Sequence, residues 1–209
     1  MVKIGVLVSG GGTNLQAIID NIKSGYINNG EIVTVVSSKD GAYALKRAEN
    51  AGICGRVISK KDFSSSDEYE EEMIRHFKDF GVELIVLAGF MTILSEKFIS
   101  AFENRIINVH PALIPSFCGD GFYGLKVHEA ALEKGVKVTG ATVHFVTAET
   151  DAGPIILQKA VDVEDDDTAA TLQKRVMEQA EWKLLPEAVK LFSEGKLEIK
   201  NNKVWRKDR

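Results

Sequence analysis

The chain has 209 residues, with 26 Lys and Arg against 30 Asp and Glu, and a net charge of −4. At roughly 150 residues per domain this length predicts one domain over residues 1–209, and the acidic balance argues against a protein that coats nucleic acid. No run approaches the ~18 apolar residues of a membrane-spanning helix, and two cysteines without metal-ligand spacing exclude a zinc ribbon or disulfide scaffold and favour a cytoplasmic protein.

The first half of the chain alternates between short apolar runs and amphipathic segments. The apolar runs predict strands at Lys3–Val8, Glu31–Val36, Val57–Ile58, Val82–Ala88 and Ile106–Val109. Helical spacing of apolar residues predicts helices at Asn14–Lys23, Ala42–Ala51, Ser66–Phe80 and Ser95–Phe102. Such alternation is typical of βαβ units, so we expect an α/β fold with a doubly wound, mostly parallel sheet.

The pattern changes after residue 137. Lys137–Val146 and Pro154–Val163 both alternate between apolar and polar residues, which predicts an antiparallel pair at the C-terminal edge of a sheet of about seven strands. One long helix is predicted at Thr168–Phe192. A small hairpin is predicted at Leu197–Trp205, with its turn at Asn201 and Asn202.

A glycine-rich turn, Ser9–Asn14 (SGGGTN), separates the first strand from the first helix. Glycines let the backbone approach an anion, and the helix N-terminus supplies free N–H groups, so the turn favours phosphate binding. Thr13 and Asn14 are suited to capping the helix or contacting the phosphate. No lysine follows the glycines, and Leu15 occupies the third glycine position of a dinucleotide fingerprint, which excludes a Walker A loop and NAD. A plain strand-to-helix turn stays open.

Asn108-Val109-His110-Pro111 ends the fifth predicted strand. Asn108 and His110 lie two positions apart and therefore on one side of the strand, at the end where open α/β sheets bind ligands. A carboxamide can donate to a developing oxyanion, and histidine can exchange a proton near neutral pH. Asp151 stands between the two alternating strands, where a turn-forming role is equally open.

The other histidines give weaker signals. The position of His144 on an alternating strand favours a packed residue or one that supports site residues. The position of His76 on a charged helix favours a solvated residue. His128, on a predicted helix after a glycine-rich loop, stays undecided. No nucleophile elbow is present, and neither cysteine neighbours a histidine in sequence. The acidic stretch 162–167 favours a solvated loop over a metal site.

Several segments together resemble the phosphoribosylglycinamide formyltransferase family. The matching segments, in the order of the family and across nearly the whole chain, are SGGGTNLQA (9–17), LAGFMTILS (87–95), INVHPALIP (107–115), TGATVHFVTAETDAGPIILQ (139–158) and the last long helix. The resemblance implies the formyltransferase fold, with a phosphate- or nucleotide-binding half at 1–110 and a folate-binding and C-terminal half at 111–209.

The resemblance also implies a reaction. A formyl group would pass from 10-formyltetrahydrofolate, used as a co-substrate, to the primary amine of glycinamide ribonucleotide in purine synthesis, without a metal or a covalent enzyme intermediate. Asn108, His110 and Asp151 match the catalytic residues. Asn108 and protonated His110 would stabilise the oxyanion, while Asp151 would keep His110 charged and, with an ordered water, assist proton transfer.

Binding residues are implied in the same way. The residues expected to bind the acceptor substrate are Gly12, Thr13 and Asn14 for its phosphate, and Glu178 and Glu181 in the last helix, with Glu181 toward the glycyl amine. The residues expected to bind the folate are Met91, Thr92, Ile93, Leu94, Asn108, Thr147, Ala148, Glu149, Thr150 and Asp151. The expected partners are therefore small molecules, with no nucleic acid and no membrane, in a monomer or homodimer.

The chain departs from the family pattern in three places. Thr92 and Ser66 stand where members carry arginine, which affects the expected affinity for the folate tail and not the reaction. The segment 116–124 is longer and richer in glycine than the corresponding loop, which favours a lid over the site.

Four alternative functions fit the sequence less well. Methionyl-tRNA formyltransferase needs a further C-terminal domain of roughly a hundred residues and a tRNA partner, which length and charge disfavour. Formyltetrahydrofolate deformylase carries an N-terminal regulatory domain, whereas the glycine turn here begins at residue 9. A phosphate-binding module leaves Asn108, His110 and Asp151 unexplained. An NAD oxidoreductase fails at Leu15 and lacks an acidic residue after the second strand.

Overall fold

The computed structural model describes residues 1–207. The chain divides into two compact units, Met1–Ile107 (unit 1) and a second that begins at Asn108 (unit 2). Among the described residues, no helix combines the length and the apolar character needed to cross a membrane.

Unit 1 alternates strand and helix along the chain, as predicted. Its complete strands are β1 (Val2–Val8), β2 (Gly30–Ser37), β3 (Cys54–Val57) and β4 (Leu84–Leu87). Its helices are α1 (Thr13–Lys23), α2 (Tyr43–Asn50), α3 (Ser66–Asp79) and α4 (Glu96–Ala101), with a single 3-10 turn at Lys60–Asp62. Strand β1 pairs in parallel with β2 and with β4, and β2 pairs in parallel with β3.

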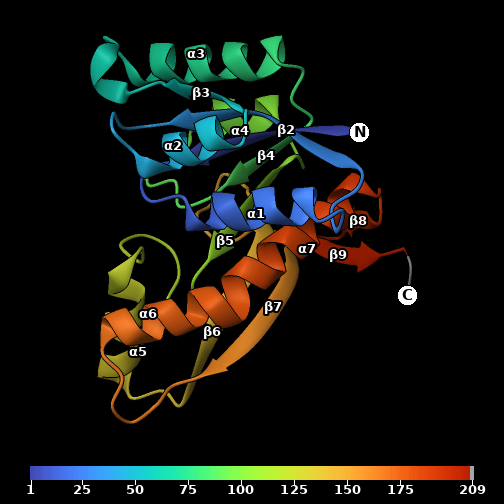
Figure 1. The fold of residues 1–209 in the computed structure, drawn as a ribbon. Coiled ribbons are helices and arrows are strands. Elements are labelled where there is room, and N and C mark those ends of the chain that lie inside the picture. Colours follow the sequence, from blue (N-terminus) through green and yellow to red (C-terminus); the bar gives the residue numbers. More distant parts are fainter. Residues whose placement is uncertain (208–209) are drawn as a thin grey trace. The chain divides into compact units, whose positions relative to one another are not determined.

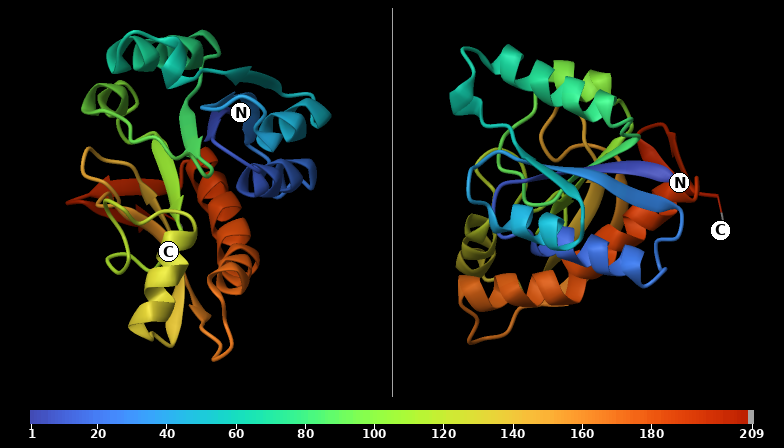
Figure 2. Two further views of the ribbon diagram at one scale, coloured as in Figure 1. Left: turned by 90° about the vertical axis from the view of Figure 1, so that its left-hand side faces the viewer. Right: turned by 45° about the horizontal axis from the view of Figure 1, so that its top comes forward.

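The helices of unit 1 cover both faces of these strands. Figure 2 shows α1 and α2 on one side and α3 and α4 on the other. The inner strands β1, β2 and β4 are mostly buried and apolar, and the four residues of β4 are all buried, whereas the edge strand β3 is largely exposed. The doubly wound arrangement predicted from the alternation is confirmed.

Aromatic side chains of α3 and α4 pack against a glycine in β1. Phe77 makes edge-to-face contacts with Phe98 and Phe102, and all three rings are buried. A Cβ atom at Gly5 would lie only 2.7 Å from Cε1 of Phe77. Gly5 is therefore required by the close approach of the ring.

His76 is buried, so the prediction of a solvated histidine was wrong. The Arg56 guanidinium lies 3.3 Å from Nδ1 and can only donate, so Nδ1 accepts and Nε2 donates to the Thr34 hydroxyl at 2.8 Å. Burial, and then the charge of Arg56, lower the pKa of His76. The ring lies against Phe80 on the inner side of the charged helix, which a pattern dominated by charged residues did not reveal.

Unit 2 begins within strand β5 (Ile106–His110), which crosses from one unit into the other. Its remaining elements are α5 (Leu125–Lys134), β6 (Val138–Phe145), β7 (Ile155–Asp162), α6 (Ala169–Val176), α7 (Trp182–Ser193), β8 (Leu197–Lys200) and β9 (Lys203–Arg206) (Figure 1). Strands β6 and β7 are antiparallel, and α7 packs against both.

The strand order is β3-β2-β1-β4-β5-β6-β7, with the antiparallel β7 at one edge. This order confirms the predicted seven-stranded, mostly parallel sheet with an antiparallel C-terminal edge. Strands β8 and β9 form a separate hairpin, and Asn201 and Asn202 at its turn both have positive φ, as a type I′ turn requires.

The predicted single helix Thr168–Phe192 is interrupted. Five residues, Met177–Glu181, form a π-helical turn between α6 and α7. Pro186 lies inside α7 and cannot donate the backbone hydrogen bond that an α-helix expects at its position. The wider π-helical turn just before α7 accommodates the loss of the hydrogen bond that the proline cannot make. The spacing of apolar residues in the sequence does not reveal this turn.

We predict that Gly5→Ala lowers the free energy of unfolding by about 1–3 kcal/mol, because the added methyl would overpack against Phe77. Denaturant unfolding of the purified variant measures this change. Gly10→Ala is the control, since a Cβ there meets no atom within 4 Å. The double variant Gly5→Ala with Phe77→Leu should recover part of the loss; a Gly5→Ala variant as stable as wild type would contradict the packing argument.

A second prediction concerns acid stability. His128 is fully buried with both ring nitrogens unpartnered, and burial, followed by the charge of His110, lowers its pKa to about 4. The unfolded chain takes up a proton near the ordinary pKa of 6.5 and the folded chain does not, so stability falls as pH drops from 6.5 toward 4. His128→Leu should remove about 3 kcal/mol of this fall by pH 4, at 1.36 kcal/mol per pKa unit. Denaturant titrations of both proteins between pH 7 and 4 test this; parallel curves would contradict it.

Candidate active site

Three of the predicted site residues lie together in unit 2. Asn108 and His110 stand two positions apart at the carboxyl end of β5, so their side chains leave the strand on the same side. Asp151 comes from the loop between β6 and β7, and its Oδ2 lies 3.4 Å from Nδ1 of His110. Both side chains of this pair are buried. The fold therefore joins a strand end and a distant loop into one cluster.

Both ring nitrogens of His110 face oxygen atoms. Nε2 lies 2.8 Å from the Phe117 carbonyl oxygen, which only accepts, so Nε2 carries a hydrogen. Nδ1 faces the Asp151 carboxylate, where a second hydrogen is favoured. Burial lowers the pKa of His110, whereas the charge of Asp151 and the Phe117 carbonyl raise it. Asp151 acts in the expected direction, but burial is the larger effect and the pKa stays below its usual value.

Asp151 is held as an anion. Burial alone would raise its pKa, but the His144 ring, the charge of His110 and the Gly119 N–H together hold that pKa below its usual range. The Gly119 N–H donates to Oδ2 at 3.0 Å, and His144 Nε2 lies 3.5 Å from Oδ1. Asp151 has a φ of 55°, a left-handed conformation that aspartate tolerates in turns.

His144 joins the cluster and takes the second of the two roles expected for it, that of a residue supporting the site residues. It is buried on β6, and its Nδ1 donates to the Phe145 carbonyl at 2.9 Å. Its Nε2 lies 3.3 Å from the Asn108 amide nitrogen and 3.5 Å from Oδ1 of Asp151. One ring thereby orients the carboxamide and the carboxylate. The signal available in the sequence was the presence of a histidine, a polar residue, on a strand that is otherwise buried.

The segment 116–124 contacts the same pair through its backbone. The Phe117 carbonyl accepts from His110, and the Gly119 N–H donates to Asp151. Phe117 has a φ of 49° and its ring contacts that of Phe122. The segment therefore participates in orienting the cluster, whereas its role as a lid stays a prediction.

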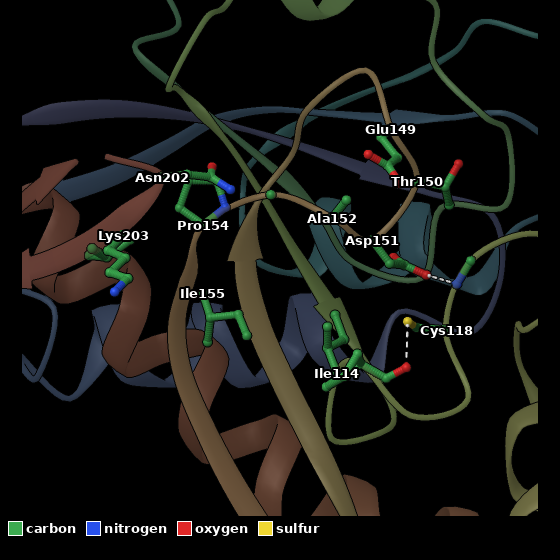
Figure 3. A pocket seen from close by; sticks show the side chains of 14 residues that line it. Ile114, Cys118, Glu149, Thr150, Asp151, Ala152, Pro154, Ile155, Asn202 and Lys203 are labelled. Atoms are coloured by element: carbon green, nitrogen blue, oxygen red, sulfur yellow. Dashed lines mark hydrogen bonds between the residues drawn. The ribbon is translucent and has the colours of Figure 1, made fainter. Parts of the chain in front are cut away.

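A cavity of about 760 Å³ opens beside Asp151 in unit 2 (Figure 3). Figure 3 shows Asp151 bonded to the Gly119 backbone at its edge, with Cys118 bonded to the Pro115 carbonyl nearby. The cavity is lined by Ile114, Pro115, Cys118, Gly119, the loop residues 149–155 and the hairpin residues Asn202, Lys203 and Val204. The predicted folate residues Glu149 and Thr150 are exposed at this cavity, whereas the Asp151 side chain is only 9% exposed.

The rest of the predicted folate loop is shaped by local contacts. The Thr147 hydroxyl donates to the Glu149 carbonyl at 3.2 Å across Ala148. A Cβ atom at Gly153 would lie 1.8 Å from the Phe145 carbonyl oxygen, so only glycine fits where the loop returns to β7. These contacts fix the shape of the loop that carries Asp151.

The glycine turn lies in unit 1. Gly12 has a φ of 72°, and a Cβ there would lie 2.6 Å from the Ala44 Cβ, so the close packing of α2 requires glycine. Arg47 on α2 donates to the Gly11 carbonyl at 2.9 Å. Gly12 itself is the N-cap of α1, without a side-chain cap, so of the two roles considered for Thr13 and Asn14 the structure excludes helix capping and leaves phosphate contact as a prediction. Both residues instead begin α1.

The segment Met91–Leu94 also belongs to unit 1 and follows β4. The Met91 N–H donates to the Ser9 hydroxyl at 3.0 Å, next to the glycine turn. Ile93 is 71% exposed and Met91 is 49% exposed, whereas Leu94 is buried in the core. Exposed apolar side chains on a fixed loop suit a flat apolar ring system.

Glu178 and Glu181 both lie in the π-helical turn of unit 2. Glu181 is buried, and Glu178 is partly exposed and 3.8 Å from Lys174. Isolated π-turns occur frequently at functional sites, and this one coincides with the stretch predicted to bind the acceptor. Their contact with a ligand stays a prediction.

Comparison with known proteins identifies the family. The family model for formyl transferases matches residues 2–189. The chain belongs to this family. It is 42% identical over 202 residues to a phosphoribosylglycinamide formyltransferase of Haemophilus influenzae, covering 97% of this chain and 92% of that protein. The crystal structure of glycinamide ribonucleotide transformylase 1 from Symbiobacterium toebii has a TM-score of 0.93 at 43% identity, covering 99% of this chain and 94% of the other.

Some formyl transferase relatives are much longer. The trifunctional purine biosynthetic protein adenosine-3 of Gallus gallus is 48% identical over 198 residues, which are 95% of this chain and 19% of that protein. The chain therefore spans about a fifth of the length of such multifunctional relatives and nearly all of the bacterial one.

We predict that Asp151→Asn lowers the pKa of His110 further, because it removes the negative charge that raises it. Titration of the His110 ring by NMR in both proteins measures the shift. Asp165→Asn, an exposed aspartate paired with Lys137, serves as the control. An unchanged or higher pKa in Asp151→Asn would show that Asp151 does not act on the His110 ring.

Proposed function

We propose that this chain transfers the formyl group of 10-formyltetrahydrofolate to the primary amine of glycinamide ribonucleotide, giving formylglycinamide ribonucleotide and tetrahydrofolate in purine biosynthesis. The observation that carries the proposal is the partly buried cluster of Asn108, His110 and Asp151 in a member of the formyl transferase family. Asn108 supplies an amide donor, His110 a titratable ring and Asp151 a fixed anion. Acyl transfer to an amine needs groups of these three kinds.

The reaction requires no nucleophile from the protein. The acceptor amine attacks the formyl carbon, and the Asn108 amide donates to the oxygen on which negative charge develops. The His110 Nε2–H becomes a second donor by exchanging the Phe117 carbonyl for this oxygen. That charge favours the protonated ring, whose Nδ1 is already directed at Asp151. The amine loses one proton and N10 of the leaving folate gains one; Asp151, through a water molecule, carries this proton between them.

His144 has a positioning role in this proposal. Nε2 of its ring contacts both the Asn108 amide nitrogen and the Asp151 carboxylate. The Asn108 donor is therefore oriented before any substrate arrives, which lowers the reorganisation needed in the transition state.

The binding of the two substrates is assigned to surfaces of suitable chemistry. The formyl donor presents a flat bicyclic ring and an aromatic tail, which fit the exposed Met91 and Ile93 and the loop Thr147–Asp151. The acceptor phosphate is assigned to Gly12, Thr13 and Asn14 at the start of α1, where N–H groups lack a side-chain cap. Glu178 and Glu181 are assigned to the remainder of the acceptor.

The remaining assignments follow from this chemistry. We assign the protein to the cytoplasm, which agrees with two free cysteines. Its partners are the two small substrates, and it acts as a monomer or homodimer over one domain with functional halves at 1–110 and 111–209.

The decisive experiment mixes purified protein with 10-formyltetrahydrofolate and follows formyl loss with and without glycinamide ribonucleotide. Loss only in the presence of the amine is expected. Loss without the amine would make the protein a hydrolase, and no loss in either mixture would refute formyl transfer.

We predict that Asp151→Asn reduces turnover by about 10²- to 10⁴-fold, the usual effect of removing a general acid–base group, while the fold is retained. Steady-state kinetics and circular dichroism measure the two properties. Asp165→Asn should keep normal turnover, because its carboxylate is exposed on the surface. Near-normal turnover in Asp151→Asn would remove this residue from the mechanism.

A further inference from the structure

The side chain of Glu70 fixes the end of the segment Met91–Ser95. Glu70 lies on α3 and is 5% exposed. Its Oε1 accepts a hydrogen bond from the Ser95 backbone N–H at 2.8 Å, and its Oε2 accepts one from the Ser95 hydroxyl. Ser95 is the N-cap of α4, where its hydroxyl also accepts from the Phe98 N–H. One buried carboxylate therefore ties α3 to the residue at which the segment ends and α4 begins.

The beginning of the segment is held by a different element. The Met91 N–H donates to the Ser9 hydroxyl, immediately after β1. Between these two attachments, Thr92 lies beside the hydroxyl of the buried Tyr69, which makes no hydrogen bond within the usual distance and angle limits. The next side chain, Ile93, is exposed to solvent. The segment is thus attached at both ends, with the side chains of Met91 and Ile93 exposed and that of Leu94 buried.

A neighbouring ion pair shows that joining the two helices does not require Glu70. Glu71, the next residue, is largely exposed and pairs with Lys97 on α4 at 2.5 Å. Glu70 is buried instead, and both of its recorded partners belong to Ser95. Burying a carboxylate is unfavourable unless its oxygens are satisfied, so its contacts to Ser95 define a specific conformation of the preceding loop.

We propose that Glu70 is a positioning residue for the formyl donor, holding Met91–Ser95 in the conformation that binds the flat ring system of a reduced folate. The inference rests on the proposed function. A loop ordered before binding loses less conformational freedom when the ligand arrives, and ligand affinity rises accordingly. Without the carboxylate, the Ser95 end of the segment is released while the Ser9 end stays attached.

The test uses Glu70→Ala, Glu70→Gln and the matched control Glu71→Ala in the full chain. Kd for 5-formyltetrahydrofolate, a stable folate probe, is measured by calorimetry, and KM for each substrate and kcat by formyl transfer. Glu70→Ala should raise the Kd and the donor KM about tenfold through loss of two charge-assisted hydrogen bonds, with the acceptor KM and kcat within about twofold. Glu71→Ala should leave all four values unchanged.

Glu70→Gln provides the rescue. Its amide oxygen can accept from the Ser95 N–H and its amide nitrogen can donate to the Ser95 hydroxyl, so folate affinity should return to within about threefold of wild type. Should Glu70→Ala not fold, Ser95→Ala removes one of the two contacts and should raise the donor Kd by a smaller factor.

The outcomes separate the two proposals. Wild-type protein that neither binds the probe nor transfers formyl refutes the proposed function. Active wild type with unchanged folate affinity in folded Glu70→Ala refutes the positioning role alone. An equal loss for donor and acceptor, or no recovery in Glu70→Gln, would indicate a merely structural role and also overturn it.

Discussion

The candidate catalytic cluster depends on the buried carboxylate of Asp151. Its two oxygens face the His110 ring, the His144 ring and the Gly119 N–H. A buried carboxylate is costly unless such partners satisfy it, and these partners come from the end of β5, from β6 and from the segment after Pro115. The anion is therefore the common partner of three separate segments. The same charge partly offsets the effect of burial on the pKa of His110, so one group both fixes the geometry of the cluster and raises the proton affinity of the ring.

In unit 1 the parallel sheet produces a comparable convergence. Strand β1 lies between β2 and β4, so the residues that follow these strands meet at one edge. The Ser9 hydroxyl after β1 bonds to the Ser38 hydroxyl after β2 at 2.7 Å and accepts from the Met91 N–H after β4. The glycine turn and the apolar segment are therefore connected through one side chain. Strand order, and not sequence proximity, brings them together.

Features that depend on local chemistry could be predicted from the sequence. Apolar periodicity located the strands and helices, and the antiparallel pair β6 and β7 followed from alternation. The Asn201–Asn202 turn followed from the tolerance of asparagine for positive φ. Asn108 and His110 followed from strand geometry, because residues two apart share a side. For Asp151 the sequence left a turn-forming and a catalytic role equally open. The structure shows features of both, a left-handed turn conformation and contacts to the His110 and His144 rings.

Features that depend on distant partners could not be predicted. The buried environment of His76 is created by Thr34 and Arg56 from other strands, and His144 owes its role to Asn108 and Asp151. The π-helical turn interrupts a periodicity that looks continuous. In each case the residue type was visible, but its partner was fixed only by the packing of elements remote in sequence.

The consecutive glutamates of α3 show why such residues escape sequence analysis. Each step along a helix turns the side chain by about 100°, so neighbouring residues meet different surroundings. Glu70 is buried against Ser95, Glu71 is exposed beside Lys97, and Glu72 pairs with Arg56 of β3 at 2.7 Å. In the sequence the three form one charged run of the kind normally assigned to solvent. In the fold they have three separate roles, and only the packing of α3 against its neighbours distinguishes the residue that fixes a loop from the residue that solvates a surface.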